Sequence, residues 1–113
     1  MDLEVQISRW EKTVKYFNES DYEYRFYIYD YLNDMDGRRI LHECLSFLDK
    51  NMSTRVELLQ RLEIADNILK NITRPTETCI WGDDNSEQYG YDKNTDWWCF
   101  RRPKGADSSW EEI

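Results

Sequence analysis

The single histidine and the three cysteines are the first residues to test for chemistry. His42 precedes Cys44 by two positions, and residues two apart on a helix point in different directions. The two side chains therefore form neither a cysteine–histidine dyad nor a metal-binding pair. The other cysteines, Cys79 and Cys99, stand far apart in the sequence, which argues against a zinc site. We expect no catalytic residue, no bound metal and no other cofactor.

Residues 92–96, with the sequence Asp-Lys-Asn-Thr-Asp, have the alternating oxygen ligands that open a calcium-binding loop. The similarity ends there, because Trp97 stands where such a loop needs glycine and Pro103 where it needs a bidentate glutamate. The sequence also has no glycine-rich phosphate loop and no nucleophile with a recognisable flanking pattern. It therefore favours a solvated acidic loop over a metal site, and a binding protein over an enzyme.

The most distinctive stretch is residues 77–104, in which two short apolar runs flank an acidic loop. The runs are residues 78–81 and 97–100, and their alternating aromatic and β-forming residues predict two antiparallel strands. The loop between them carries five carboxylates and two tyrosines against one lysine, Lys93. We expect this loop to be a presented surface.

Trp97 and Trp98 are adjacent at the end of the acidic loop. Neighbouring residues on a strand face opposite sides, so one tryptophan can enter the core while the other faces outward or lies under another segment. The sequence leaves open which one is inside. Aromatic side chains rimmed by charge are typical of hot spots in protein interfaces. We therefore predict these partner-binding residues: Asp83, Asp84, Glu87, Tyr89, Tyr91, Asp92, Asp96, Trp97 and Trp98.

The residues before the acidic stretch have the periodicity of amphipathic helices. Apolar residues at alternating spacings of four and three predict a helix over residues 3–18. Residues 22–29 also alternate like a strand, and this alternative stays open. Capping residues, Gly37 and Pro75 delimit three more predicted helices: residues 22–35, 38–50 and 54–74.

Short connections between these helices favour antiparallel neighbours in a compact bundle. We predict an α+β, mainly helical protein with about four helices in a compact bundle and a C-terminal antiparallel β-hairpin. All 113 residues are expected to form a single domain. Its helical part covers residues 3–74, and its hairpin and tail cover residues 76–113.

The net charge of −8 and the pI near 4.6 oppose direct binding to nucleic acid or to an anionic membrane surface. No apolar run approaches membrane-spanning length, and the first residues do not have the pattern of a signal peptide. We expect a cytoplasmic protein with reduced cysteines. A disulfide between Cys79 and Cys99 across the predicted strand pair is nevertheless geometrically conceivable.

Charge and aromatic content together predict a function. Carboxylates on a loop can mimic phosphate charge, so we expect an acidic immunity-type inhibitor, or antitoxin, that neutralises a basic, nucleic-acid-acting toxin or enzyme. One alternative is a regulatory or adaptor domain that binds a partner protein through a tyrosine-rich helix containing Tyr22, Tyr24 and Tyr29. A third possible function is that of an enzyme. The sequence determines neither the identity of the partner nor the oligomeric state.

Overall fold

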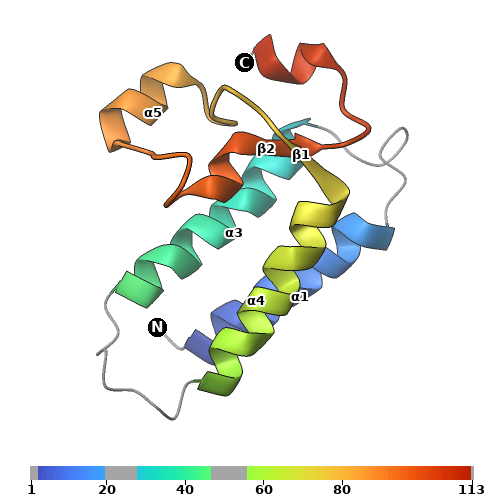
Figure 1. Ribbon diagram of the computed structural model, residues 1–113, viewed down its shortest axis with the longest axis vertical. Coiled ribbons are helices and arrows are strands. Elements are labelled where there is room, and N and C mark those ends of the chain that lie inside the picture. Colours follow the sequence, from blue (N-terminus) through green and yellow to red (C-terminus); the bar gives the residue numbers. More distant parts are fainter. Residues whose placement is uncertain (1–2, 20–27, 47–55, 113) are drawn as a thin grey trace.

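A computed structural model describes residues 3–19, 28–46 and 56–112 of the chain, and the structural statements below concern these residues. Three long helices form a bundle, and a C-terminal segment lies over one end of it, with α5 on one side and η3 on the other (Figure 1). The prediction of a mainly helical protein with an antiparallel strand pair near the C-terminus is confirmed. The elements are α1 (Leu3–Glu19), α3 (Ile28–Ser46), α4 (Val56–Ile72), β1 (Thr73–Pro75), α5 (Asp83–Tyr89), the 3₁₀-helices η2 (Trp97–Phe100) and η3 (Ser108–Glu112), and β2 (Arg101–Pro103).

Helix α1 follows the predicted pattern closely. Residues three and four positions apart lie on the same face of a helix, and here that face is completely enclosed by α3 and α4. Each of these apolar residues is at most 2% exposed, so α1 supplies one wall of the core: Leu3, Ile7, Trp10, Val14 and Phe17.

Helix α3 continues through Gly37, so the predicted boundary between two helices at this position is wrong. Gly37 is exposed, and a Cβ atom there would meet no other atom within 4 Å. A glycine inside an exposed helix costs only about 1 kcal/mol relative to alanine. Burial of Met35 before it and of Leu41 after it outweighs that cost. The possible strand at residues 22–29 falls mostly outside the described residues, and Ile28 and Tyr29 belong to α3.

The antiparallel strands lie next to the predicted positions, not at them. β1 pairs with β2, with Thr73 opposite Pro103 and Arg74 opposite Arg102. Of the two predicted strands, residues 78–81 form a turn and residues 97–100 form η2. A strand would turn alternate residues to opposite faces, whereas the 3₁₀ turn buries three consecutive side chains: Trp98, Cys99 and Phe100.

A buried ion pair connects the three long helices to the C-terminal segment. Arg38 on α3 donates two hydrogen bonds, each 3.0 Å long, to the two carboxylate oxygens of Asp66 on α4. Trp10 on α1 donates a third, 2.9 Å long, from its indole Nε1 to the same carboxylate. The guanidinium carbon of Arg38 also lies 4.4 Å from the ring centroid of Trp98 in η2. The Asp66 carboxylate thus connects the three long helices to one another and, through Arg38, to η2 in the C-terminal segment.

We predict that Asp66→Ala lowers the free energy of unfolding by about 3 to 5 kcal/mol, because it leaves the buried Arg38 cation unpaired. Urea denaturation followed by far-UV circular dichroism measures the change. Replacing both partners, as in Arg38→Met with Asp66→Leu, should recover part of the loss. Glu43→Gln, which removes the charge of one of the two carboxylates that pair with Arg39 at the surface, serves as the control and should cost less than about 1 kcal/mol. An equal cost for Asp66→Ala and Glu43→Gln would contradict the central role of the buried pair.

Asp34 on α3 makes stability depend on pH. Burial and, to a lesser extent, the nearby carboxylate of Asp30 raise the pKa of Asp34 in the folded protein. The folded state therefore holds this proton more tightly than the unfolded chain does. The stabilisation is present below the unfolded pKa and is lost as the pH rises through the folded pKa. At neutral pH the folded protein thus carries a charge that is unfavourable at this position.

Asp34→Asn is therefore expected to raise the melting temperature at neutral pH, because it removes this charge. The difference from the parent protein should disappear near pH 3, where the carboxyl group is protonated in both states. Thermal melts across this pH range measure both effects. A stabilisation that persists unchanged in acid would show that it does not come from the charge.

Candidate functional site

Residues 83–89, predicted as loop, form the short helix α5 between two glycines. Gly82 precedes the helix with φ 92° and Gly90 ends it with φ 68°, both in the region that favours glycine. The backbone N–H groups of Gly90 and Tyr91 both reach the carbonyl oxygen of Ser86 and close the last turn. Two aspartates in the first turn suit the positive end of the helix dipole. The glycine pair and these aspartates are the sequence signal that could have identified α5.

One face of α5 borders an acidic cleft with a volume of about 490 Å³. Lys93 donates a hydrogen bond 2.6 Å long from its Nζ to Glu77, which lowers the pKa of that carboxyl group. Four carboxylates against one ammonium group leave the lining with three net negative charges. The lining combines these charges with two aromatic side chains and two uncharged polar ones: Glu77, Asp83, Glu87, Asp92, Lys93, Tyr91, Phe100, Ser86 and Asn94.

The predicted acidic residues fall into two groups. Asp92 accepts hydrogen bonds from the backbone N–H groups of Asn94 and Thr95, at 2.7 and 3.2 Å. Asp96 accepts one from the backbone of Asp92, at 3.0 Å. These two aspartates therefore hold the 92–96 turn in shape. The remaining three acids are exposed on α5, and no described residue forms an ion pair with them: Asp83, Asp84 and Glu87.

An aromatic hollow, also about 490 Å³, separates α5 from α3. The Tyr91 ring lies 5.7 Å from Trp81 and 5.9 Å from Tyr89, measured between centroids. Tyr91 lines both this hollow and the acidic cleft, and its burial raises its pKa. Opposite the rings, α3 presents Arg39, which is held by Asp36 at 2.6 Å and by Glu43 at 2.8 Å. The predicted tyrosines thus line the walls of the hollows beside α5.

Of the two adjacent tryptophans, Trp98 is enclosed and Trp97 is half-buried, although the strand alternation that predicted one inner and one outer residue is absent. Trp98 is 1% exposed and packs in the core, perpendicular to Trp97 at a centroid distance of 6.0 Å. Trp97 is half-buried, and the Nζ of Lys70 lies 4.5 Å from its ring centroid. Trp97 borders a smaller hollow of about 220 Å³, which shares Glu77, Lys93 and Phe100 with the acidic cleft. Trp97 therefore extends the surface beside the cleft, whereas Trp98 supports it from below.

His42 contacts the same region from α3. Its ring lies 4.9 Å from that of Trp98, and its Nε2 lies 3.6 Å from a carboxylate oxygen of Asp96. These contacts pack α3 against residues 96–98. The expectation that the chain is not an enzyme stays a prediction.

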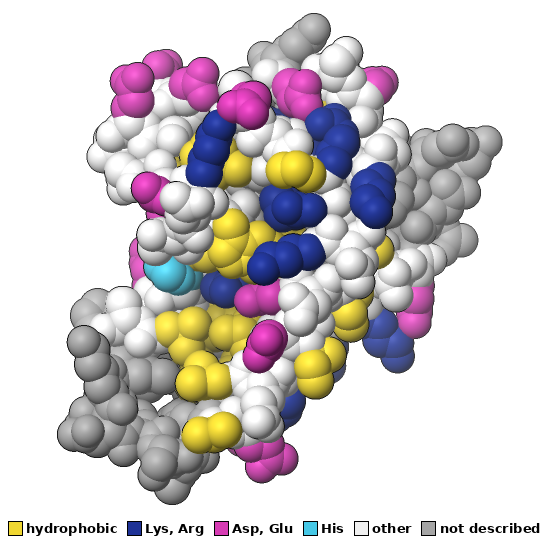
Figure 2. Space-filling model, viewed as in Figure 1, with side chains coloured by type: hydrophobic (Ala, Val, Ile, Leu, Met, Phe, Trp, Pro, Cys, Tyr) yellow, Lys and Arg dark blue, Asp and Glu magenta, His cyan; other side chains and the backbone are white. Residues whose placement is uncertain are grey.

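The charged side chains are unevenly distributed over the visible surface. Figure 2 shows acidic side chains gathered at the end that carries α5, and lysines and arginines over the strands and the end of α4. Among the described residues, no group of three or more metal-ligating side chains was found. No helix in the described ranges has the length and apolar character needed to cross a membrane.

Comparison of the chain with protein-family models, with curated proteins and with solved structures finds no match. The geometry and charge of the site are therefore the basis for assigning a function.

We predict that Asp92→Ala destabilises the protein by about 1 kcal/mol, because it removes the acceptor for two backbone N–H groups. Asp92→Asn keeps a side-chain oxygen at this position, so it should stay within about 0.5 kcal/mol of the parent protein. Glu87→Ala, at an exposed site on α5, should also stay within that range. Urea denaturation of the three variants checks this ranking, and equal stability of all three would contradict a structural role for Asp92.

Proposed function

We propose that this chain is a small inhibitor that binds a basic partner protein through α5 and the acidic cleft. The observation that carries the proposal is the convergence of Glu77, Asp83, Glu87 and Asp92 on one hollow walled by Tyr91. Asp83 and Glu87 have no ion-pair partner among the described residues, and Asp84, the third exposed carboxylate of α5, extends this negative surface.

Such a cleft suits the cationic side chains of a partner. A guanidinium group can bond a carboxylate through two parallel hydrogen bonds, and an ammonium group can contact several carboxylates at once. The negative field raises the association rate, but salt screens it. Aromatic surface slows dissociation because it adds buried area that salt does not weaken. The rings of Trp81, Tyr89 and Tyr91 supply that surface beside the charges.

The proposed partner is a nucleic-acid-acting toxin or enzyme, which the chain would neutralise as an immunity-type protein. The catalytic cleft of such a partner carries lysines and arginines that bind phosphate groups. Carboxylates on a helix can bind these lysines and arginines in place of phosphate. The net charge of −8 favours the approach of the chain to a positively charged partner. An acidic chain that blocks this cleft inhibits by excluding the nucleic acid.

The test combines Asp83→Asn, Asp84→Asn and Glu87→Gln in one variant. Stopped-flow fluorescence measures binding to a labelled oligo-arginine peptide and to a panel of basic nucleases, whose activity is assayed in parallel. We expect association to slow by about tenfold and its salt dependence to flatten, because the steering charge is lost. The melting temperature should change little, since all three sites are exposed.

A matched control changes the net charge equally at exposed acids on α1 and α4, with Glu19→Gln, Glu57→Gln and Glu63→Gln. This control should bind like the parent protein. Equal slowing in both triple variants would show that net charge, and not the cleft, governs binding. If none of the nucleases is bound or inhibited by the parent chain, the proposed class of partner is wrong.

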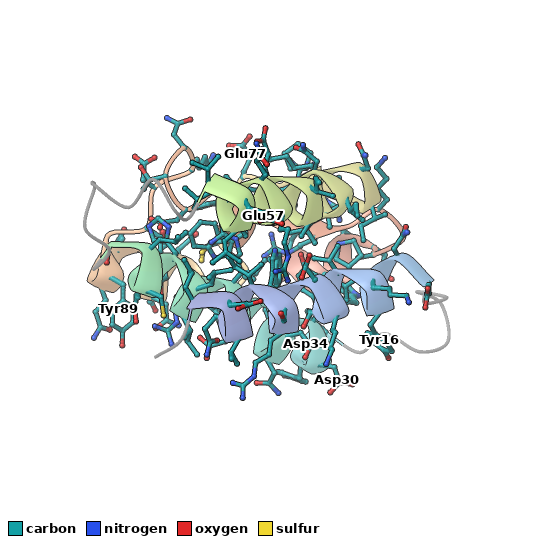
Figure 3. All side chains as sticks on the ribbon, turned by 90° about the horizontal axis from the view of Figure 1, so that it is seen from below. Tyr16, Asp30, Asp34, Glu57, Glu77 and Tyr89 are labelled. Atoms are coloured by element: carbon teal, nitrogen blue, oxygen red, sulfur yellow. The ribbon has the colours of Figure 1, made fainter. Side chains whose placement is uncertain are left out.

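The adaptor function retains one observation in its favour. Tyr29 is 68% exposed at the start of α3, whereas Tyr22 and Tyr24 fall outside the described residues. Figure 3 shows Tyr16, Asp30 and Asp34 together on one side of the molecule. In the same binding assay, Tyr29→Ala should leave nuclease binding unchanged if the acidic cleft is the interface. Weaker binding with an unchanged salt dependence would instead favour the adaptor function.

A further inference from the structure

Cys79 and Cys99 lie in contact in the interior, on two different segments. Each is 0% exposed, and both belong to the same cluster of buried side chains. The backbones are also joined, because Ile80 N–H donates to the carbonyl oxygen of Cys99 at 2.7 Å. A second bond, 2.8 Å long, runs from Thr76 N–H to the carbonyl oxygen of Phe100. The fold therefore holds two thiols together that twenty positions separate in the sequence.

The surroundings of Cys79 favour its thiolate. The hydrogen bond from Cys99 is the largest effect, and a backbone bond from Trp81 and the positive charge of Arg102 add to it. Together they outweigh burial and lower the pKa of Cys79 to about 7. The pKa of Cys99 is raised, because its proton is donated to Cys79 and its site is buried. The thiolate is the nucleophile in disulfide exchange.

Arg102 is the cation beside Cys79, and Arg38 is the one that acts on Cys99. Arg102 is 1% exposed, and each of its described bonds goes to an uncharged oxygen. Its Nη2 reaches the carbonyl oxygen of Cys79 itself at 3.2 Å. The positive charge therefore lies beside Cys79 without a carboxylate bonded to it among the described residues.

We propose that Cys79 and Cys99 form an intramolecular disulfide by exchange with a small-molecule disulfide such as oxidised glutathione. The Cys79 thiolate attacks one sulfur of glutathione disulfide, forming a mixed disulfide and releasing one glutathione thiolate. Cys99 loses its proton to solvent and attacks the Cys79 sulfur, which releases the second glutathione thiolate. The protein dithiol is oxidised by two electrons, and one glutathione disulfide is reduced to two glutathione molecules. Because both thiols are buried, the first step requires a local opening that exposes Cys79.

The disulfide would close the chain segment that carries α5 and most of the acidic cleft. Residues 79–99 include Asp83, Glu87 and Asp92, while Glu77 lies just outside. A covalent link at its base restricts the unfolded chain, which stabilises the folded state. Oxidation would therefore stabilise the folded arrangement of residues 79–99, which carry α5. The inference is independent of what that surface binds.

The test uses Cys44→Ser, in which Cys79 and Cys99 are the only thiols left among the three cysteines of the chain. The folded variant is incubated with oxidised glutathione in mildly alkaline buffer, then denatured and alkylated, and its mass is measured. We expect the loss of two hydrogen atoms and no alkylation, with a melting temperature about 10 °C higher. Dithiothreitol should reverse all three changes.

Peptide mapping of the oxidised parent protein provides a second measurement that needs no substitution. A proteolytic digest without reduction should contain one cross-linked peptide pair that carries Cys79 and Cys99. Cys44→Ser with Cys99→Ala is the control, and it should take up one glutathione at most and gain no thermal stability. Glutathione adducts without the internal link would overturn the proposal. So would two thiols that stay reduced even in mild urea, which promotes local opening.

Discussion

The contact between the Arg38 guanidinium and the Asp66 carboxylate is the constraint on which the rest of the structure depends. Two buried charges are expensive to remove from water, and only well-aligned hydrogen bonds compensate that cost. Here the carboxylate accepts from Arg38 on α3 and from Trp10 on α1, while it belongs to α4 itself. The guanidinium then stacks on Trp98, which carries η2 and the residues after it. A shift of any one of these elements would break a contact made by a buried charge.

Two further arginines anchor the C-terminal segment. Arg102 donates to Thr76 and to the carbonyl oxygens of Thr78, Cys79 and Trp110, and Arg101 donates to Thr73 and Lys70. Burial lowers the pKa of both guanidinium groups. These two arginines thus act as internal cross-links, whereas the carboxylates of α5 remain exposed.

The fold class was predictable because each long helix carries a local signal. The apolar spacing in α1 needs only neighbouring residues, and it places Ile7, Trp10 and Val14 in the core as expected. The prediction of a helix boundary at Gly37 is wrong for an equally local reason: glycine favours a break, but burial on both sides keeps α3 continuous. The prediction of a strand at 97–100 is wrong because an alternating pattern cannot reveal that three consecutive side chains are buried.

The sequence by itself determined the helical bundle and the excess of carboxylates after residue 82. Each follows from the chemistry of residues close together along the chain. Only the tertiary structure decided that Trp98 is the inner one, that Glu77 joins the acidic cleft and that Cys79 touches Cys99. These outcomes depend on contacts between distant segments, such as the Trp10–Asp66 bond across 56 positions. Local periodicity does not encode which distant partner a buried side chain meets.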